Sequence, residues 1–271
     1  DEAGGFAGTT ARGFNNSTNP VARRIRSRDN KGYSSAAFGN LYAEVDFLEH
    51  FTARSSFGGA FFNFQNRFLN YRTYENSENV GSYTFGEGAG NGGGWTWTNT
   101  IRYGQEIGKH NINFIGGIEA IADGYFRGLN GSGLNPFTIN PTYLTITNTD
   151  ASGRFVGSGG NPLTKLFSQF GKVDYSYDDR YLFSGTLRRD GASVFGEDNR
   201  YGIFPAVSAG WRITEEAFMD GTDWLNELKI RGGWGKMGNS RISPNNLFNT
   251  ASSSPTVGYD ISGANSSTLS G

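Results

Sequence analysis

The chain has 271 residues, a formal net charge of −1 and no cysteine. Without cysteine it cannot form a disulfide, a cysteine-ligated metal centre or a thiol nucleophile. The nearly balanced charge lacks the basic footprint of a nucleic-acid-binding protein. Aromatic residues make up 15% of the chain and glycine supplies 41 residues, which favours strands and turns over helices. A mean hydropathy of −0.49 and the lack of a long apolar run exclude a transmembrane helix but not a membrane β-barrel.

Neither end of the chain carries a targeting signal. Asp1 to Gly5 contain no basic region and no apolar region, so a signal peptide is not part of this sequence. The stretch from Ser252 to Gly271 is rich in Ser, Gly and Asn and ends without a strand signal. We therefore expect the chain to be a piece of a longer protein.

Alternation of apolar and polar residues predicts eight strands arranged as four hairpins. In the first strand, Leu41, Ala43, Val45 and Phe47 alternate with polar or aromatic neighbours. The same period of two recurs in the other segments. The predicted strands cover residues 40–47, 51 onward, 95–107, 111–123, 167–177, 181–190, 204–213 and 228–235.

Short and long connections alternate strictly between these strands. Tight turns are expected near residues 49, 109 and 179, and a link at 214–227 with one short helix joins the last pair. The Gly-rich run at 86–94 is expected to be part of a flexible loop. Outer-membrane barrels have short periplasmic turns and long extracellular loops. The predicted extracellular loops are residues 1–35, 67–94, 124–164, 191–203 and 239–271.

The two faces of the predicted strands differ in a way that also favours a membrane barrel. One face is aromatic and aliphatic, with aromatic residues near the strand ends, as in interfacial girdles. The other face is charged, which suits a hydrated lumen but not a packed core. The residues expected to face lipid are Val173, Tyr175, Phe183, Leu187, Val207, Trp211, Ile230 and Trp234. The residues expected to face the lumen, and our candidates for substrate contact, are Lys172, Asp174, Arg188, Asp190, Arg212, Lys229 and Arg231.

Four segments in the second half of the chain resemble one family. Residues 170–182 read Phe-Gly-Lys-Val-Asp-Tyr-Ser-Tyr-Asp-Asp-Arg-Tyr-Leu and residues 187–196 read Leu-Arg-Arg-Asp-Gly-Ala-Ser-Val-Phe-Gly. Residues 199–213 and 228–239 follow in the order expected of the next strands. Together they resemble the barrel signature of SusC/RagA-type TonB-dependent outer-membrane transporters. Asn19-Pro20 and residues 39–44 are similar to an earlier barrel segment of that family, and Val194 departs from it where an Arg is common.

The resemblance implies an all-β fold, an antiparallel transmembrane β-barrel of which this chain holds about eight strands. Barrels of that class have 22 strands and a plugged lumen. It implies a location in the bacterial outer membrane, in contact with the lipid bilayer, and active import of oligosaccharides or peptides. It also implies two partners, a SusD-like surface lipoprotein and the TonB energising complex, the latter acting through a plug region that this chain lacks. Residues 1–271 would then be part of the barrel domain.

No enzyme motif outweighs its structural explanation. His50 and His110 fall in separate turns, so neither a catalytic triad nor a two-histidine metal site is expected. The Gly-x-Gly spacing within residues 86–91 precedes a strand and not the helix that a phosphate-binding loop needs. The carboxylate pairs Asp178-Asp179 and Glu215-Glu216 suit turns and a helix start. We expect no catalytic residue, no metal and no cofactor.

Arg188 and Asp190 form the most informative charged cluster. Alternation places both on the predicted lumen face, where they form a structural ion pair or meet a substrate, and we favour the ion pair. A second function stays open beside import. The chain could belong to a surface β protein that does not transport, such as an adhesin or a glycan-binding module, with its Asn-, Gly- and Tyr-rich loops as binding elements.

Overall fold

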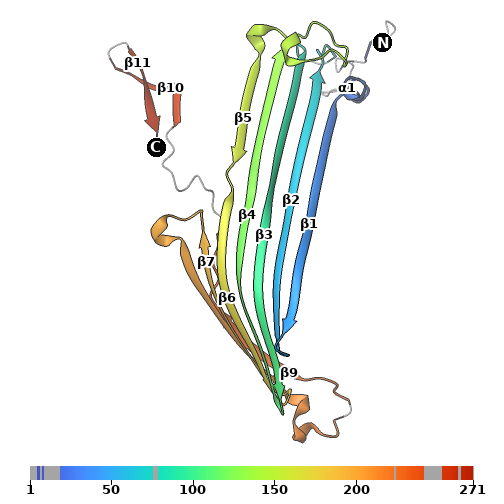
Figure 1. Ribbon diagram of the computed structural model, residues 1–271. Helices are drawn as coiled ribbons and strands as arrows, with labels where there is room; N and C mark the ends of the chain where they lie inside the picture. Colours follow the sequence, from blue (N-terminus) through green and yellow to red (C-terminus); the bar gives the residue numbers. More distant parts are fainter. Residues whose placement is uncertain are drawn as a thin grey trace. The chain divides into compact units, whose positions relative to one another are not determined.

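The computed structural model describes residues 5, 6, 8, 19–75, 79–222 and 224–240, together with the backbone of residues 252–261 and 264–270. Most of these residues lie in long antiparallel strands (Figure 1). The main strands are β1 (Lys31–Phe47), β2 (Phe51–Asn70), β3 (Thr84–Ile107), β4 (His110–Leu134), β5 (Phe155–Asn161), β6 (Thr164–Tyr177), β7 (Tyr181–Ala192), β8 (Tyr201–Arg212) and β9 (Lys229–Gly235).

The eight predicted strands are confirmed, in order, as β1, β2, β3, β4, β6, β7, β8 and β9 of one sheet. β5 also pairs with β4, through Phe126 to Ser132. β1 and β9 end the order of described strands, and every residue of both is exposed. Such edges present unpaired backbone groups. Two exposed edge strands are expected where a sheet is part of a larger, closed sheet.

The helical elements are few and short. They are α1 (Pro20–Ser27) and the 3-10 turns η1 (Ile146–Asn148), η2 (Ala151–Gly153), η3 (Glu197–Asn199), η4 (Ile213–Glu215) and η5 (Ala217–Met219). Among the described residues, no helix combines the length and the apolar character needed to cross a bilayer. Two 3-10 turns, η4 and η5, replace the single short helix expected in the link before β9.

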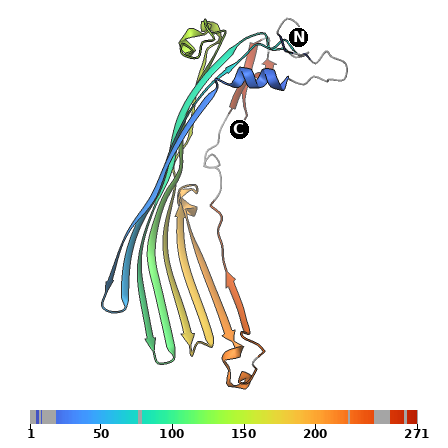
Figure 2. The same cartoon turned by 90° about the vertical axis from the view of Figure 1, so that its right-hand side faces the viewer.

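The hairpin turns fall where they were predicted. The β6–β7 turn has Asp178 at φ +51° and Asp179 at φ +53°, and the β3–β4 turn has Gly108 at φ +60°. Tight hairpin turns of this kind require residues in the left-handed conformation, which Asp and Gly tolerate well. These turns and the β8–β9 link gather at one end of the strands (Figure 2).

Most predicted loop boundaries are wrong, because the strands extend beyond the segments with clear alternation. The segment 1–35 contains α1 and the start of β1, and the segment 124–164 contains the end of β4 and all of β5. Within the predicted loops 67–94, 124–164 and 191–203, the residues left between strands are 71–83, 135–154, 162–163 and 193–200. In the segment 239–271 the backbone forms a separate pair of strands, β10 (Ser252–Ile261) and β11 (Ala264–Ser270).

The Gly-rich run at 86–94 is not a loop but the first part of β3. A Cβ atom on Gly86, Gly90 or Gly92 would come within 2.3 to 2.7 Å of the rings of Phe68, Phe64 and Phe62 on β2, respectively. Aromatic side chains thus lie over alternate glycines of the neighbouring strand, an arrangement that supports glycine in a sheet. The glycines here make room for the rings.

The chain divides into two compact units. The loop unit comprises residues 1–39, 59–94 and 124–163, and the turn unit comprises residues 40–58, 95–123 and 164–271. β1 to β4 contribute residues to both. The loop unit has a small core of Leu69, Phe85 and Leu144, whereas the sheet of the turn unit exposes large apolar residues on one face.

Candidate functional site

The register of β6 to β9 places the predicted apolar set on one face of the sheet. Val207 lies opposite Trp234, Trp211 opposite Ile230, and Tyr175 opposite Phe183. Directly paired residues of an antiparallel sheet point to the same side. Leu187 and Val207 are both more than half exposed. A contiguous exposed apolar surface on a sheet marks contact with lipid or with another protein.

The opposite face of the same strands carries a network centred on Arg188. Its Nε donates to Asp190 Oδ1 at 2.7 Å, and its Nη2 donates to Glu119 Oε1 and to Ser168 Oγ, each at 2.7 Å. Thr98 Oγ1 donates to the other oxygen of Glu119 at 3.3 Å. One guanidinium thereby connects β3, β4, β6 and β7. The pair of Arg188 and Asp190 expected from the sequence is present, with two partners that the sequence did not reveal.

The Arg188 side chain is fixed by hydrogen bonds but remains partly exposed. Its side chain is 33% exposed, and those of Glu119 and Asp190 are 22% and 24% exposed. The ring of Phe170 lies 5.5 Å from the guanidinium carbon, which adds a cation–π contact. The network therefore braces four strands and still presents charge to whatever occupies this side of the sheet.

The other polar candidates lie nearer the turns, on the same face as Arg188. Lys172 Nζ lies 2.8 Å from Asp174 Oδ2, and Arg212 is directly opposite Lys229 on β9. Asp174, Lys229 and Arg231 line a groove of 690 Å³ together with several Asn and Ser residues. The structure thus places the seven candidates in two groups, with Arg188 and Asp190 apart from the rest.

Arg212 has an unused hydrogen-bond donor. Its Nε is buried and has no hydrogen-bond partner within the described residues. Its direct neighbour across the ladder is the cation Lys229, and a buried unpaired donor is costly. A carboxylate or hydroxyl from a ligand or from another segment could accept this hydrogen bond. Sequence reasoning placed Arg212 on this face but could not identify the open donor.

A second polar network lies at the hairpin turns, and sequence reasoning missed it. Glu216, which follows η4, accepts hydrogen bonds from the Tyr181 hydroxyl at 2.7 Å, the Trp211 indole N–H at 2.9 Å and the Arg180 guanidinium at 3.0 Å. Arg180 also contacts Asp178, which lies 2.7 Å from Lys109 Nζ. Three connections are tied together in this way, those of β3–β4, β6–β7 and β8–β9.

These hydrogen bonds favour the charged form of Glu216. Donation by Tyr181 and Trp211, and then by Arg180, lowers the pKa of the Glu216 carboxyl below its ordinary value. Hydrogen bonds from Lys109 and Arg180 likewise lower the pKa of Asp178. Both carboxylates therefore remain ionised throughout the physiological range.

We expect the fluorescence of Trp211 to report the protonation of Glu216. A lowered folded-state pKa means that the contribution to stability is present above the ordinary value of about 4.3 and is lost as pH falls through the lower folded value. The difference in emission between the full-length protein and its Trp211→Phe variant should therefore stay constant from pH 7 to 5 and change only below about pH 4. Glu216→Gln should abolish this change and Glu215→Gln should preserve it. A change centred above pH 5 would contradict the assignment.

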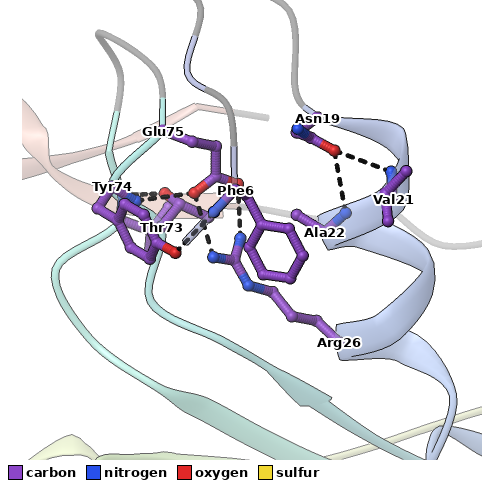
Figure 3. A network of polar contacts seen from close by, with 9 residues as sticks. Phe6, Asn19, Val21, Ala22, Arg26, Thr73, Tyr74 and Glu75 are labelled. Atoms are coloured by element: carbon purple, nitrogen blue, oxygen red, sulfur yellow. Dashed lines mark hydrogen bonds and ion pairs between the residues drawn. The ribbon is translucent and has the colours of Figure 1, made fainter. Parts of the chain in front are cut away.

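In the loop unit, a buried ion pair fastens α1 to the segment that follows β2 (Figure 3). Asn19 caps the helix by accepting from the backbone N–H groups of Val21 and Ala22. Arg26 donates to both oxygens of Glu75, at 2.5 and 3.1 Å, and the Glu75 side chain is fully buried. The network fixes the helix against the β2–β3 connection.

Aromatic rings and a backbone N–H complete the environment of this pair. The guanidinium carbon of Arg26 lies 5.2 Å from the Phe6 ring centre and 5.5 Å from that of Tyr74. The Tyr74 N–H donates to Glu75 at 2.9 Å. The hydrogen bonds from Arg26 lower the pKa of Glu75 although burial opposes this. No sequence motif connected Arg26 with Glu75, which is distant in the chain.

The β4–β5 connection is also folded onto the loop unit. Leu144 packs in the small core with Leu69 and Phe85. Arg67 donates to the carbonyl oxygens of Pro141 and Leu144. These contacts hold the connection against β2 and β3, so its side chains are presented from a defined backbone.

The two histidines do not meet. His110 Nδ1 lies 2.8 Å from the Tyr175 hydroxyl, and the His50 ring lies edge-on to Tyr103. In the part of the chain that the structure describes, no group of three or more His, Cys, Asp or Glu side chains could hold a metal ion.

No family model matches the chain, but individual curated proteins do. The chain is 32% identical over 245 residues to TonB-dependent receptor P26 of Formosa agariphila, a match that covers 84% of the chain and 23% of the receptor. It is 30% identical over 229 residues to TonB-dependent receptor P39 of the same organism, covering 83% of the chain and 21% of that receptor. The chain therefore spans about a quarter of the length of these relatives.

A shorter segment is more similar to another receptor. Over 77 residues, 28% of the chain, the identity to TonB-dependent receptor SusC of Bacteroides thetaiotaomicron is 48%, although this is only 8% of SusC. All these relatives are named as receptors, which is consistent with the expectation that the chain is not an enzyme.

Solved structures have the same fold. The RagAB peptide transporter matches 96% of the chain with a TM-score of 0.75 at 18% identity, and the match covers 28% of that structure's chain. The open form of the RagAB peptide importer matches 99% of the chain with a TM-score of 0.76, covering 29%. The chain thus has the fold of a β-barrel segment, and its sequence is similar to TonB-dependent receptors over most of its length and to SusC over a shorter part.

Proposed function

We propose that the whole protein imports a nutrient across the outer membrane of a Gram-negative bacterium, with energy supplied through TonB. The observation that carries this proposal is the similarity to TonB-dependent receptors over 84% of the chain. The exposed apolar face of the turn unit supports it, because a barrel wall needs an outer surface that lipid can cover. In this proposal the present segment supplies wall, lumen surface and connections.

The proposed cargo is an oligosaccharide or a peptide, and the proposed partner is a SusD-like surface lipoprotein. SusC is named among the receptors that the chain matches, and the RagAB structures are described as a peptide transporter. The Arg188 network and the polar groove at Lys229 and Arg231 offer charged and hydroxyl groups that suit either cargo. TonB would act through a plug region outside this sequence.

We propose that the connections 71–83, 135–154 and 193–200 lie on the extracellular side. They join β2 to β3, β4 to β5 and β7 to β8, and along the chain they alternate with three tight turns and with the link of residues 213–228. Outer-membrane barrels place such turns on the periplasmic side and the loops on the extracellular side. Residues 135–154 are the best candidate for contact with a lipoprotein partner or a cargo, because Arg67 and the core around Phe85 hold this connection in a defined fold.

Uptake by cells tests the proposal. Cells that make the full-length protein should accumulate a labelled oligosaccharide or peptide on which they depend, and deletion of TonB should abolish the accumulation. Arg188→Gln should lower uptake at least five-fold while Arg188→Lys keeps part of it, since Lys keeps the charge but not the forked geometry. TonB-independent accumulation would contradict the proposal. Equal uptake by both Arg188 variants and the unaltered protein would remove Arg188 from the transport path.

The same cells test the role of the β4–β5 connection. The Phe137 N–H donates to the Asn148 carbonyl at 2.9 Å and Leu144 belongs to the core, so a Gly–Ser linker can replace residues 138–143 and leave both in place. The variant should reach the membrane in normal amounts but copurify less lipoprotein or import less cargo. Normal values of both would exclude this connection as a binding element.

A further inference from the structure

Arg189 places a positive charge on the apolar face of the turn unit. Alternation places Gln169 and Arg189 on the same face as Val173 and Leu187. Gln169 and Arg189 lie directly opposite each other, and Arg189 Nη1 donates to Gln169 Oε1 at 3.0 Å. Arg189 is thus on the face opposite Arg188 and outside the network described above.

Tyr201 of β8 fixes the position of this cation. The guanidinium carbon of Arg189 lies 4.0 Å from the centre of the Tyr201 ring, a close cation–π contact. Arg189 is exposed and makes no ion pair with any residue that the structure describes. Its guanidinium is oriented by Tyr201 and Gln169, and its other N–H groups remain available to an acceptor.

The location of Arg189 agrees with the edge of a membrane-facing band. The opposite edge has Tyr177 beside Tyr181 and Tyr181 beside Trp211. A strand tilted by about 40° climbs roughly 2.6 Å per residue. Arg189 and Tyr201 then lie roughly 21 and 26 Å from that aromatic row, and the apolar band of such barrels is about 25 Å tall.

Other residues of the same end fit an interface between hydrocarbon and headgroups. Phe57 and Trp95 stack with ring centres 6.0 Å apart, and the Trp97 indole N–H donates to Ser55 at 3.1 Å. Trp97 precedes Thr98, which donates to Glu119 in the Arg188 network, so Trp97 lies at about the level of Arg188 and Arg189. Trp is enriched at membrane interfaces. Lys165, exposed and on the same side of β6 as Gln169, adds a second positive charge toward the loop end.

We propose that Arg189, oriented by Tyr201 and Gln169, binds the phosphate of a lipid headgroup in the outer leaflet, with Lys165 adding to the positive charge. A planar guanidinium recognises phosphate through two parallel hydrogen bonds. The apolar residues below Arg189 cover the acyl chains of the same lipid, which a free phosphate would not use. The inference rests on the proposed membrane location of the barrel.

Lipid retention by the full-length protein tests the inference. The protein, purified in neutral detergent, is incubated with a phosphorylated lipid A or with the same lipid after removal of its phosphates, and bound lipid is counted by native mass spectrometry. Arg189→Gln should weaken binding of the phosphorylated lipid about ten-fold, equivalent to about 1.4 kcal/mol. The affinity of Arg189→Lys for the phosphorylated lipid should fall between those of Arg189→Gln and the unaltered protein. The dephosphorylated lipid should bind all variants equally weakly.

Arg102→Gln is the control, because Arg102 is an exposed arginine of β3 that donates to Asn113 at the polar groove, on the face opposite Arg189. It should bind the phosphorylated lipid as the unaltered protein does. Equal binding by Arg189→Gln and Arg102→Gln would overturn the inference. Displacement of the lipid by an equal concentration of inorganic phosphate would also overturn it. Failure of the unaltered protein to enter the outer membrane would instead contradict the proposed function.

Discussion

Arginine at Leu187 or Val207 should destabilise the folded full-length barrel by about 2–4 kcal/mol. Both side chains are more than half exposed on the apolar face. They lie about midway along β7 and β8, where a charge would sit near the centre of the bilayer. The free energy of unfolding is measured by reversible urea denaturation in lipid vesicles. The folded fraction is read from the change in electrophoretic mobility that accompanies barrel folding.

Arginine at Ser184 or Ser208 is the control for this comparison. These two residues lie directly opposite each other on β7 and β8, on the face that carries Asp174 and Lys172. A cation there stays in a polar environment, so the cost should remain within about 0.5 kcal/mol. Equal tolerance of arginine on both faces would count against a membrane-facing surface.

The strands and their faces could be predicted from the sequence because period-two alternation is a local signal. It placed Val207 and Trp234 on one face, and the register confirms that they are paired. The limits of the strands could not be predicted in the same way. β1 begins at Lys31 and β3 at Thr84, in segments where Gly, Asn and Ser hide the alternation.

The Gly-rich start of β3 shows what signal was overlooked. Glycine was interpreted as a mark of flexibility, although it can also make room for a neighbour. Phe62, Phe64 and Phe68 occupy alternate positions of β2, and Gly86, Gly90 and Gly92 occupy matching alternate positions of β3. Complementary spacing of large and absent side chains in successive segments could have indicated paired strands.

The sites were less predictable, because their residues meet through register. Arg188 and Asp190 are neighbours on one strand, so their pairing could be expected. Glu119 and Ser168 reach Arg188 from β4 and β6, and no local pattern specifies which residues of those strands lie at the same level. Glu216 was interpreted as a helix start, whereas its carboxylate faces Tyr181 and Trp211.

The start of helix α1 has a local sequence signal, but the contact that holds the helix does not. Asn19 followed by Pro20 is a helix-start signal, since Asn accepts hydrogen bonds from the first turn and Pro suits its first position. The segment was nevertheless predicted as loop because it shows no apolar stripe. Its stability depends on the long-range pair of Arg26 and Glu75, which the sequence does not reveal.

Glu75→Gln should release α1 from the loop unit. Removing one partner of a buried ion pair costs about 3–5 kcal/mol, because the other charge is left buried without its counterion. Glu75 is fully buried and Arg26 is 13% exposed. Hydrogen exchange measured on the full-length protein should show the amides of residues 21–27 losing most of their protection while those of β6 and β7 keep theirs.

Glu44→Gln is the matched control, because Glu44 pairs with Arg54 at 3.4 Å with both side chains more than 40% exposed. An exposed pair contributes less than about 1 kcal/mol, so α1 should keep its protection. Arg26 lowers the pKa of Glu75, and the stabilisation is therefore present above the ordinary value of about 4.3 and lost as pH falls through the lower folded value. Corrected for intrinsic exchange rates, protection of α1 should be equal at pH 7 and 5 and fall below pH 4. Unchanged protection in Glu75→Gln would show that the ion pair does not hold the helix.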